Sequence, residues 1–149
     1  GSKTEANWNS EGMMRYEVYP HTADAGVRGI GKTVSEAFEG AAMATFSIMA
    51  DLDHVKPEVA VSIELSADSL EDLLVKWLNE LISLSSLEGL IFSKFEVKVY
   101  ERNFYLKGKA WGQDMRSVPV HEEVKAATYA DLKVEKIGDK WIAQCIVDV

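Results

Sequence analysis

The chain has little cysteine and no long apolar run. One cysteine, Cys145, among 149 residues excludes an intramolecular disulfide and a metal cage built from several thiolates. Cys145 lies in the apolar run WIAQCIVDV, where a buried and inert thiol is expected rather than a nucleophile. No apolar run approaches the ~20 residues that a membrane span requires, and no signal peptide is visible, so we expect a cytoplasmic protein that does not enter a membrane.

Basic side chains are also scarce. Lysine and arginine number 16 against 24 aspartates and glutamates, which gives a net charge of −8. Binding to phosphate groups needs a basic footprint, so direct nucleic-acid binding is not expected. An acidic surface favours cations and basic protein surfaces instead. Any role in RNA biology is therefore expected to act through another protein.

The common catalytic motifs are missing. The sequence contains no GxSxG nucleophile turn, no GxxxxGK[ST] phosphate loop and no HExxH zinc motif. Gly26, Gly29 and Gly31 do not fit GxGxxG and suit a strand that another backbone approaches closely. A small metal-dependent hydrolase that uses Asp24 and Asp148 is therefore disfavoured, because the sequence offers no nucleophile or base motif to accompany them.

Residues 1–13 are polar, lack periodicity and begin with the Gly-Ser pair typical of a cleaved tag, so we expect a disordered leader. Residues 14–149 then form one domain. Two segments have helical periodicity, 33–51 and 69–86, and each opens on a capping pair, Thr33 with Glu36 and Ser69 with Asp72. Both are expected to be amphipathic helices that face the core.

The remaining segments resemble strands. They are expected at 15–20, 26–31, 59–67, 95–101, 104–112, 124–129, 132–138 and 140–149, with a tight hairpin turn at Gly138-Asp139. The order lacks the regular alternation of strand and helix that builds a parallel sheet. The sequence predicts a single α+β domain, mainly antiparallel β-sheet(s) with the two helices packed on one side.

Acidic groups occur at two informative places. Asp24 lies in the stretch HTAD, and Asp148 precedes the terminal Val149 at the end of an apolar strand. Together with the chain-terminal carboxylate they would supply the hard oxygen ligands that Ca²⁺ or Mg²⁺ prefers. Alternatively, Asp24 caps a turn and Asp148 is a solvated chain end. On these residues alone the second interpretation is favoured, because aspartate is a common turn residue.

A second polar stretch is HEEVKAATYADL, which includes Glu123 and Lys125. In a strand these two side chains project to one face. The residues alone favour a half-exposed strand with a weak surface charge pair over a functional site.

Three stretches in order, HTADAG, EVKAATY and a chain end of aspartate plus one aliphatic residue, resemble the archease family. The intervening AFEGAAMATFSIMAD, LLVKWLNELI and RNFYLKGKAWG are also similar, so the resemblance covers residues 14–149. It implies an accessory protein without enzymatic activity of its own. Such a protein promotes guanylylation and multiple turnover of the GTP-dependent tRNA-splicing RNA ligase, which joins 2′,3′-cyclic phosphate or 3′-phosphate ends to a 5′-hydroxyl. A general chaperone or adaptor for RNA-processing enzymes is the alternative.

The resemblance also implies a divalent cation, Ca²⁺ first and Mg²⁺ or Mn²⁺ as alternatives. Asp24, Asp148 and the Val149 carboxylate would be its ligands, and Lys125 a functional neighbour. His21 and Glu123 are further candidates for the surface that faces the partner, with His21 expected to orient its loop by hydrogen bonding. The family often has histidine after the TY of the third stretch, where this chain has Ala130, so no role is carried over to that position.

Overall fold

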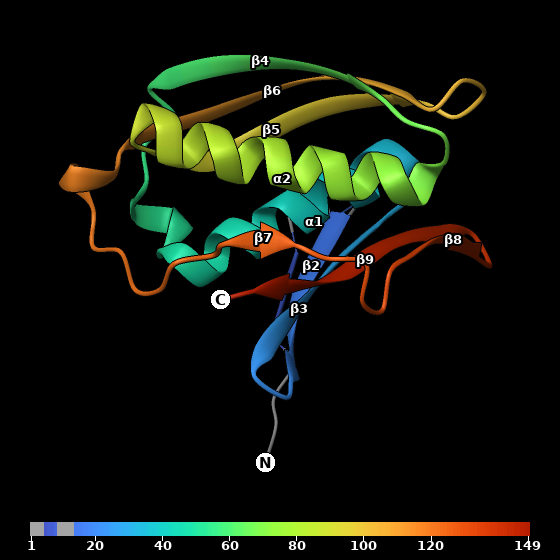
Figure 1. Ribbon diagram of the computed structural model, residues 1–149, viewed down its shortest axis with the longest axis horizontal. Helices are drawn as coiled ribbons and strands as arrows, with labels where there is room; N and C mark the ends of the chain where they lie inside the picture. Colours follow the sequence, from blue (N-terminus) through green and yellow to red (C-terminus); the bar gives the residue numbers. More distant parts are fainter. Residues whose placement is uncertain (1–4, 9–13) are drawn as a thin grey trace.

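The computed structural model describes residues 5–8 and 14–149, which form two antiparallel sheets and two helices (Figure 1). The larger sheet has the order β1-β2-β3-β9-β7, and β8 also pairs with β9. Its strands are β1 (Glu5–Trp8), β2 (Met14–His21), β3 (Asp24–Gly31), β7 (Ala126–Ala127), β8 (Lys133–Ile137) and β9 (Lys140–Asp148). The smaller sheet, of order β4-β6-β5, consists of β4 (Val59–Ser66), β5 (Leu90–Tyr100) and β6 (Tyr105–Asp114).

The helices α1 (Val34–Met49) and α2 (Leu70–Glu88) lie between the two sheets and cover one face of each (Figure 1). Both expected capping residues act at the helix starts. Thr33 Oγ1 accepts a hydrogen bond from the Glu36 backbone N–H, and Ser69 Oγ accepts one from that of Asp72. The α+β class with two helices and antiparallel sheets is thus confirmed.

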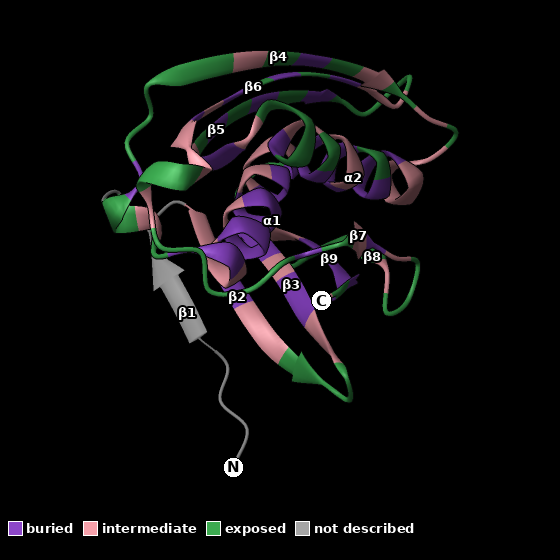
Figure 2. Cartoon of the chain, turned by 60° about the vertical axis from the view of Figure 1, so that its left-hand side comes forward, coloured by how far each residue is buried: buried purple, intermediate pink, exposed green. Residues whose placement is uncertain are grey.

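The core fills the space between the sheets. Its largest fully buried side chains include Trp77, Phe38, Phe46 and Phe92, and Figure 2 shows the buried residues on the inner surfaces of the elements. Trp77 Nε1 donates a hydrogen bond to the Phe38 carbonyl at 3.0 Å, which links α2 to α1 and satisfies the buried indole. Cys145 is fully buried, as expected, and burial raises the pKa of its thiol to about 12.

Some boundaries differ from the sequence-based expectation. The predicted strand at 124–129 is reduced to Ala126–Ala127, although Thr128 and Ala130 still exchange backbone hydrogen bonds with Ile146 of β9. The strand β5 begins earlier than expected, at Leu90. Residues 5–8 of the expected disordered leader form β1, an edge strand that pairs with β2, so the expectation was wrong for these four residues. Residues 1–4 and 9–13 of that segment lie outside the described residues. Neither helix is long and apolar enough to cross a membrane within the part of the chain that the structure describes.

Candidate functional site

The HTAD stretch forms the tip of the β2–β3 hairpin. His21 and Asp24 are opposite each other in the strand register, and Thr22 and Ala23 make the turn. The tip projects from the body of the molecule and is exposed at His21, Thr22 and Ala23, whereas Asp24 is half-buried (Figure 2). A two-residue connection is the usual way to join antiparallel strands, so local sequence is enough to place these residues at a tip.

The sheet register brings the chain end next to this tip. The pairs Gly26–Ile146 and Ala25–Val147 join β3 to β9, so Asp24 and Asp148 occupy the following pair of positions. Neighbouring strands are about 4.8 Å apart, and alternate residues share a face. Val27 and Val147 are fully buried on the core face, so the intervening alternation assigns Asp24 and Asp148 together to the opposite face.

The short strand β7 completes the group from the other side of β9. Ala126 pairs with Asp148, and the Lys125 backbone N–H donates to the Asp148 carbonyl at 2.7 Å. The Val149 side chain packs against the core, which keeps the terminal carboxylate at this end of the sheet. Three adjacent strands, far apart in sequence, thus bring Asp24, Asp148, the chain terminus and Lys125 to one sheet end, which we call the chain-end cluster.

Two of the sequence-predicted residues lie at its margins. Glu123 is exposed two residues before Lys125, outside any strand. His21 is exposed at the hairpin tip, and within the described ranges its side chain makes no hydrogen bond or ion pair. Orientation of the loop by His21 therefore stays a prediction.

The chain-end cluster brings two aspartates together, and carboxylate oxygens are the ligands that hard cations prefer. Among the residues that the structure describes, no group of three or more His, Cys, Asp or Glu side chains could hold a metal ion. A cation here would consequently depend on the terminal carboxylate and on water to complete its coordination.

Asn79 of α2 holds β7 in place, a role that the sequence pattern does not predict. Asn79 Nδ2 donates to the Ala127 carbonyl at 3.1 Å, and Asn79 Oδ1 accepts from the Ala127 N–H at 2.8 Å. One edge of the two-residue strand is thus paired with β9 and the other with an amide side chain. The signal in the sequence is a lone amide among the apolar residues of the helical run LLVKWLNELI.

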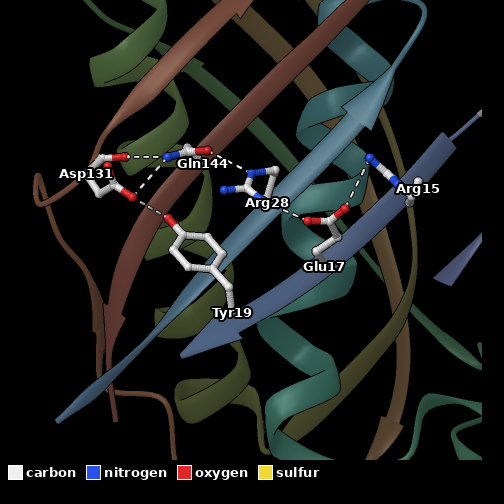
Figure 3. A network of polar contacts seen from close by, with 6 residues as sticks. All are labelled: Arg15, Glu17, Tyr19, Arg28, Asp131 and Gln144. Atoms are coloured by element: carbon white, nitrogen blue, oxygen red, sulfur yellow. Dashed lines mark hydrogen bonds and ion pairs between the residues drawn. The ribbon is translucent and has the colours of Figure 1, made fainter. Parts of the chain in front are cut away.

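A polar network on the outer face of the larger sheet was also missed (Figure 3). It connects Asp131, whose φ of 52° is in the left-handed region, to β2, β3 and β9. Tyr19 Oη donates to Asp131 Oδ2 at 2.8 Å, and Gln144 Nε2 donates to the same oxygen at 3.0 Å. Burial, together with the bond to Asp131, raises the pKa of Tyr19, so the phenol remains a donor.

The network continues across the sheet from Gln144. Arg28 Nε donates to Gln144 Oε1 at 2.8 Å, and Arg28 Nη1 donates to Glu17 Oε2 at 2.7 Å (Figure 3). The loop before β8 is thereby tied to the strands that carry the chain-end cluster. The Ala130 carbonyl accepts from the Ile146 N–H at 3.0 Å, so this position contributes through its backbone.

An open groove of about 670 Å³ runs beside the cluster, between the second half of α2 and the segment 115–125. Its apolar lining includes Met49, Ile82, Leu87, Ile91, Met115 and Val120, and Glu122, Glu123 and Lys125 lie at its polar side. Leu87 is 79% exposed and Val120 48% exposed, so both are accessible from solvent at the groove. Glu123 and Lys125 therefore belong to both the groove and the region of the cluster.

Comparison with known proteins agrees with this architecture. Residues 16–149 match the model of the Archease protein family (MTH1598/TM1083). Protein archease of Pyrococcus furiosus is 41% identical over 142 residues, covering 92% of this chain and 100% of its own length. That of Methanosarcina barkeri is 38% identical over 146 residues, covering 95% and 99% of the two chains.

Two solved structures are similar as well. The solution structure of protein 1598 of Methanobacterium thermoautotrophicum has a TM-score of 0.79 and 31% identity, covering 90% of this chain and 98% of that one. The crystal structure of an archease from Thermotoga maritima, described as a possible chaperone, has a TM-score of 0.55 and 21% identity, with 87% and 93% covered, and shares the fold. From the family match and these identities over nearly the whole length, the chain belongs to the archease family.

Proposed function

We propose that this protein is a non-enzymatic activator of the GTP-dependent tRNA-splicing RNA ligase, and that it promotes guanylylation and repeated turnover of that enzyme. The observation that carries the proposal is the sheet register that brings Asp24 and Asp148 to adjacent strands at one sheet end, where the Lys125 backbone bonds to Asp148. Family membership supports the choice of partner.

The chain-end cluster is the working site in this proposal. Asp24, Asp148 and the Val149 carboxylate would hold a divalent cation, Ca²⁺ first and Mg²⁺ or Mn²⁺ as alternatives. When bound, that cation neutralises carboxylates whose mutual repulsion otherwise opposes their approach. Lys125 contributes a positive charge next to them, and His21 and Glu123 face the partner.

The net charge of −8 suits this role. A ligase cleft that binds RNA and GTP must be basic, and an acidic surface is attracted to it over distances of about a Debye length, ~8 Å at physiological salt. The exposed hairpin tip is the part of the larger sheet that can reach into such a cleft without displacing the core.

The test is single-turnover guanylylation of the matching ligase with wild-type protein and with Asp24→Asn and Asp148→Asn. The stimulation of guanylylation by each variant is expected to be lower than that by the wild type by about tenfold or more, the usual effect of disturbing a metal site. Asp139→Asn is the matched control, because Asp139 is exposed in the hairpin at the opposite end of β9. Equal stimulation by all three variants would refute the proposed working site.

The open groove favours a second function, a general chaperone or adaptor that binds RNA-processing enzymes through apolar contacts. Its exposed Leu87 and Val120 are the kind of side chains that hold a partner's apolar segment. This function predicts suppression of the aggregation of unrelated proteins, insensitive to chelators. The ligase-activator function predicts no suppression of aggregation of unrelated proteins, and it predicts an activity that chelators abolish.

A further inference from the structure

The outer face of the smaller sheet is uncovered. Both helices pack on the inner face of β4, β6 and β5, and the opposite face is turned to solvent (Figure 1). The inner positions Val97, Leu106 and Ala110 are buried, so the alternating positions between them point outward. This open sheet face has no partner within the described chain.

The register arranges the outward positions in rows across the three strands. From one end to the other, the rows are Ala60–Trp111–Lys94, Ser62–Lys109–Glu96, Glu64–Lys107–Lys98 and Ser66–Tyr105–Tyr100. We call this grid the lysine–aromatic face. From Tyr105 to Trp111 it extends about 20 Å along β6.

The charge of this face differs in sign from that of the whole chain. It carries the four lysines Lys94, Lys98, Lys107 and Lys109 and the two glutamates Glu64 and Glu96, in a protein of net charge −8. Lys98 and Lys107 are direct cross-strand partners, an arrangement that is destabilising because like charges repel. Glu64 lies 3.8 Å from Lys107 in an exposed pair, which offsets only part of that repulsion. An anion over this face would relieve the rest.

The aromatic rings lie among the lysines. Lys94 Nζ lies 4.8 Å from the centre of the Trp111 ring and Lys98 Nζ 5.5 Å from that of Tyr100. Tyr100 is 40% exposed, and its ring centre is 5.5 Å from that of Tyr105. A nucleic-acid base stacked on an aromatic ring contributes roughly 5- to 150-fold in affinity. That exceeds the gain from an exposed lysine–ring contact, so a base can displace the ammonium group.

We infer that the lysine–aromatic face binds single-stranded nucleic acid without sequence preference, with the lysines at the phosphates and the tyrosines and tryptophan beneath the bases. Positive charge interleaved with aromatic rings on an open sheet is the combination that single-strand binders use. The net charge of the chain predicts no direct nucleic-acid binding, but it averages over the whole surface and does not describe this face. The inference does not depend on the proposed ligase partner.

The experiment measures binding of a fluorescent single-stranded RNA of about twelve nucleotides by anisotropy at several salt concentrations. The variant Lys98→Ala/Lys107→Ala removes the like-charged pair. It is expected to weaken binding about tenfold at low salt and to reduce the slope of log K against log salt by about 1.4. Because the two lysines repel each other, the variant should fold at least as well as the wild type, which thermal unfolding checks.

The matched control is Lys133→Ala/Lys136→Ala, which removes the same charge from exposed positions of β8 in the other sheet. Its affinity is expected to stay within about twofold of the wild type, since these lysines lie away from the face. Equal losses in both double variants, or no binding by the wild type, would overturn the inference.

Stacking is tested separately with Tyr100→Leu, which keeps apolar bulk and removes the ring. Roughly tenfold weaker RNA binding is expected, with an unchanged salt slope. A poly-glutamate peptide of matching charge should compete poorly, because it has no bases. Wild-type affinity in Tyr100→Leu, or efficient competition by the peptide, would instead indicate an acidic protein partner and overturn the assignment.

Discussion

At the residue scale, Gly29 determines how closely α1 approaches the larger sheet. A Cβ at Gly29 would lie 1.8 Å from the Ala37 carbonyl oxygen and 2.4 Å from the Ala41 nitrogen. Gly40 faces it from the helix, and a Cβ there would be 2.8 Å from the Gly29 Cα. The close backbone approach expected for the glycines of this strand is confirmed at Gly29, where the approaching backbone is that of α1. At Gly26 the nearest group is instead the Tyr19 ring.

Gly29→Ala is expected to lower the free energy of unfolding by about 3 kcal/mol, because two backbone segments must separate to admit one methyl group. Gly138→Ala is the matched control. Gly138 has a φ of 63°, but its added Cβ meets nothing within 4 Å. The control should cost only about 1 kcal/mol of backbone strain. Urea unfolding of the two variants measures the difference, and equal losses would contradict a steric role for Gly29.

At the element scale, α1 covers one of the two edges of the smaller sheet, the one formed by β5. The strand β5 lies at that edge, and its free N–H groups point to the helix. The Val97 N–H donates to Glu39 Oε2 and the Val99 N–H donates to Ser35 Oγ, both at 2.9 Å. An uncovered edge of this kind invites pairing with other chains. The helix thus protects the edge with side chains, at the cost of partly burying Glu39.

The partial burial of Glu39 predicts a pH dependence of stability. Burial raises the pKa of Glu39 from its ordinary 4.5 to about 7, although the Val97 N–H opposes the shift. Between these values the folded protein binds a proton that the unfolded chain has lost. The contribution of Glu39 to the free energy of unfolding is therefore expected to fall as pH rises from about 4.5 to about 7 and to stay level above that range.

Glu39→Gln keeps an acceptor for the Val97 N–H and removes the titration. We expect this variant to match the wild type at pH 4 and to be more stable by about 1–2 kcal/mol at pH 8, after allowance for partial solvent screening. Chemical denaturation across this pH range measures the difference. Glu58→Gln, at an exposed glutamate, is the control. A constant difference between Glu39→Gln and the wild type at all pH values would argue against titration of Glu39.

At the scale of the whole molecule, charge is distributed unevenly. The chain carries −8, the chain-end cluster gathers carboxylates at one end of the larger sheet, and the lysine–aromatic face occupies the smaller sheet. Negative charge on one sheet and positive charge on the other would let one molecule bind a cation or a basic protein at one place and an anion at another. The core between the sheets keeps the two regions in a constant relation.

A bound cation should stabilise the entire fold, because it binds the folded chain and not the unfolded one. At a Ca²⁺ concentration about a hundredfold above the dissociation constant, the gain is about 2.7 kcal/mol, which raises Tm by several degrees. Calorimetry with and without a chelator measures this shift. It should vanish in Asp24→Asn and Asp148→Asn and persist in Asp139→Asn, and a shift retained in all three would place the cation elsewhere.

The two helices, most strands, the Gly138-Asp139 turn and the family motifs could all be predicted from local patterns in the amino-acid sequence. Capping pairs, alternation and turn residues act over a few neighbouring positions, so they can be seen without the fold. Strand order and register depend on contacts between distant segments, so they became visible with the folded structure. They place Asp24 next to Asp148, Asn79 against β7, Glu39 under the β5 edge and four lysines on one open face. These groups are separated by long stretches of chain and meet only because burial of the shared core selects one pairing of strands.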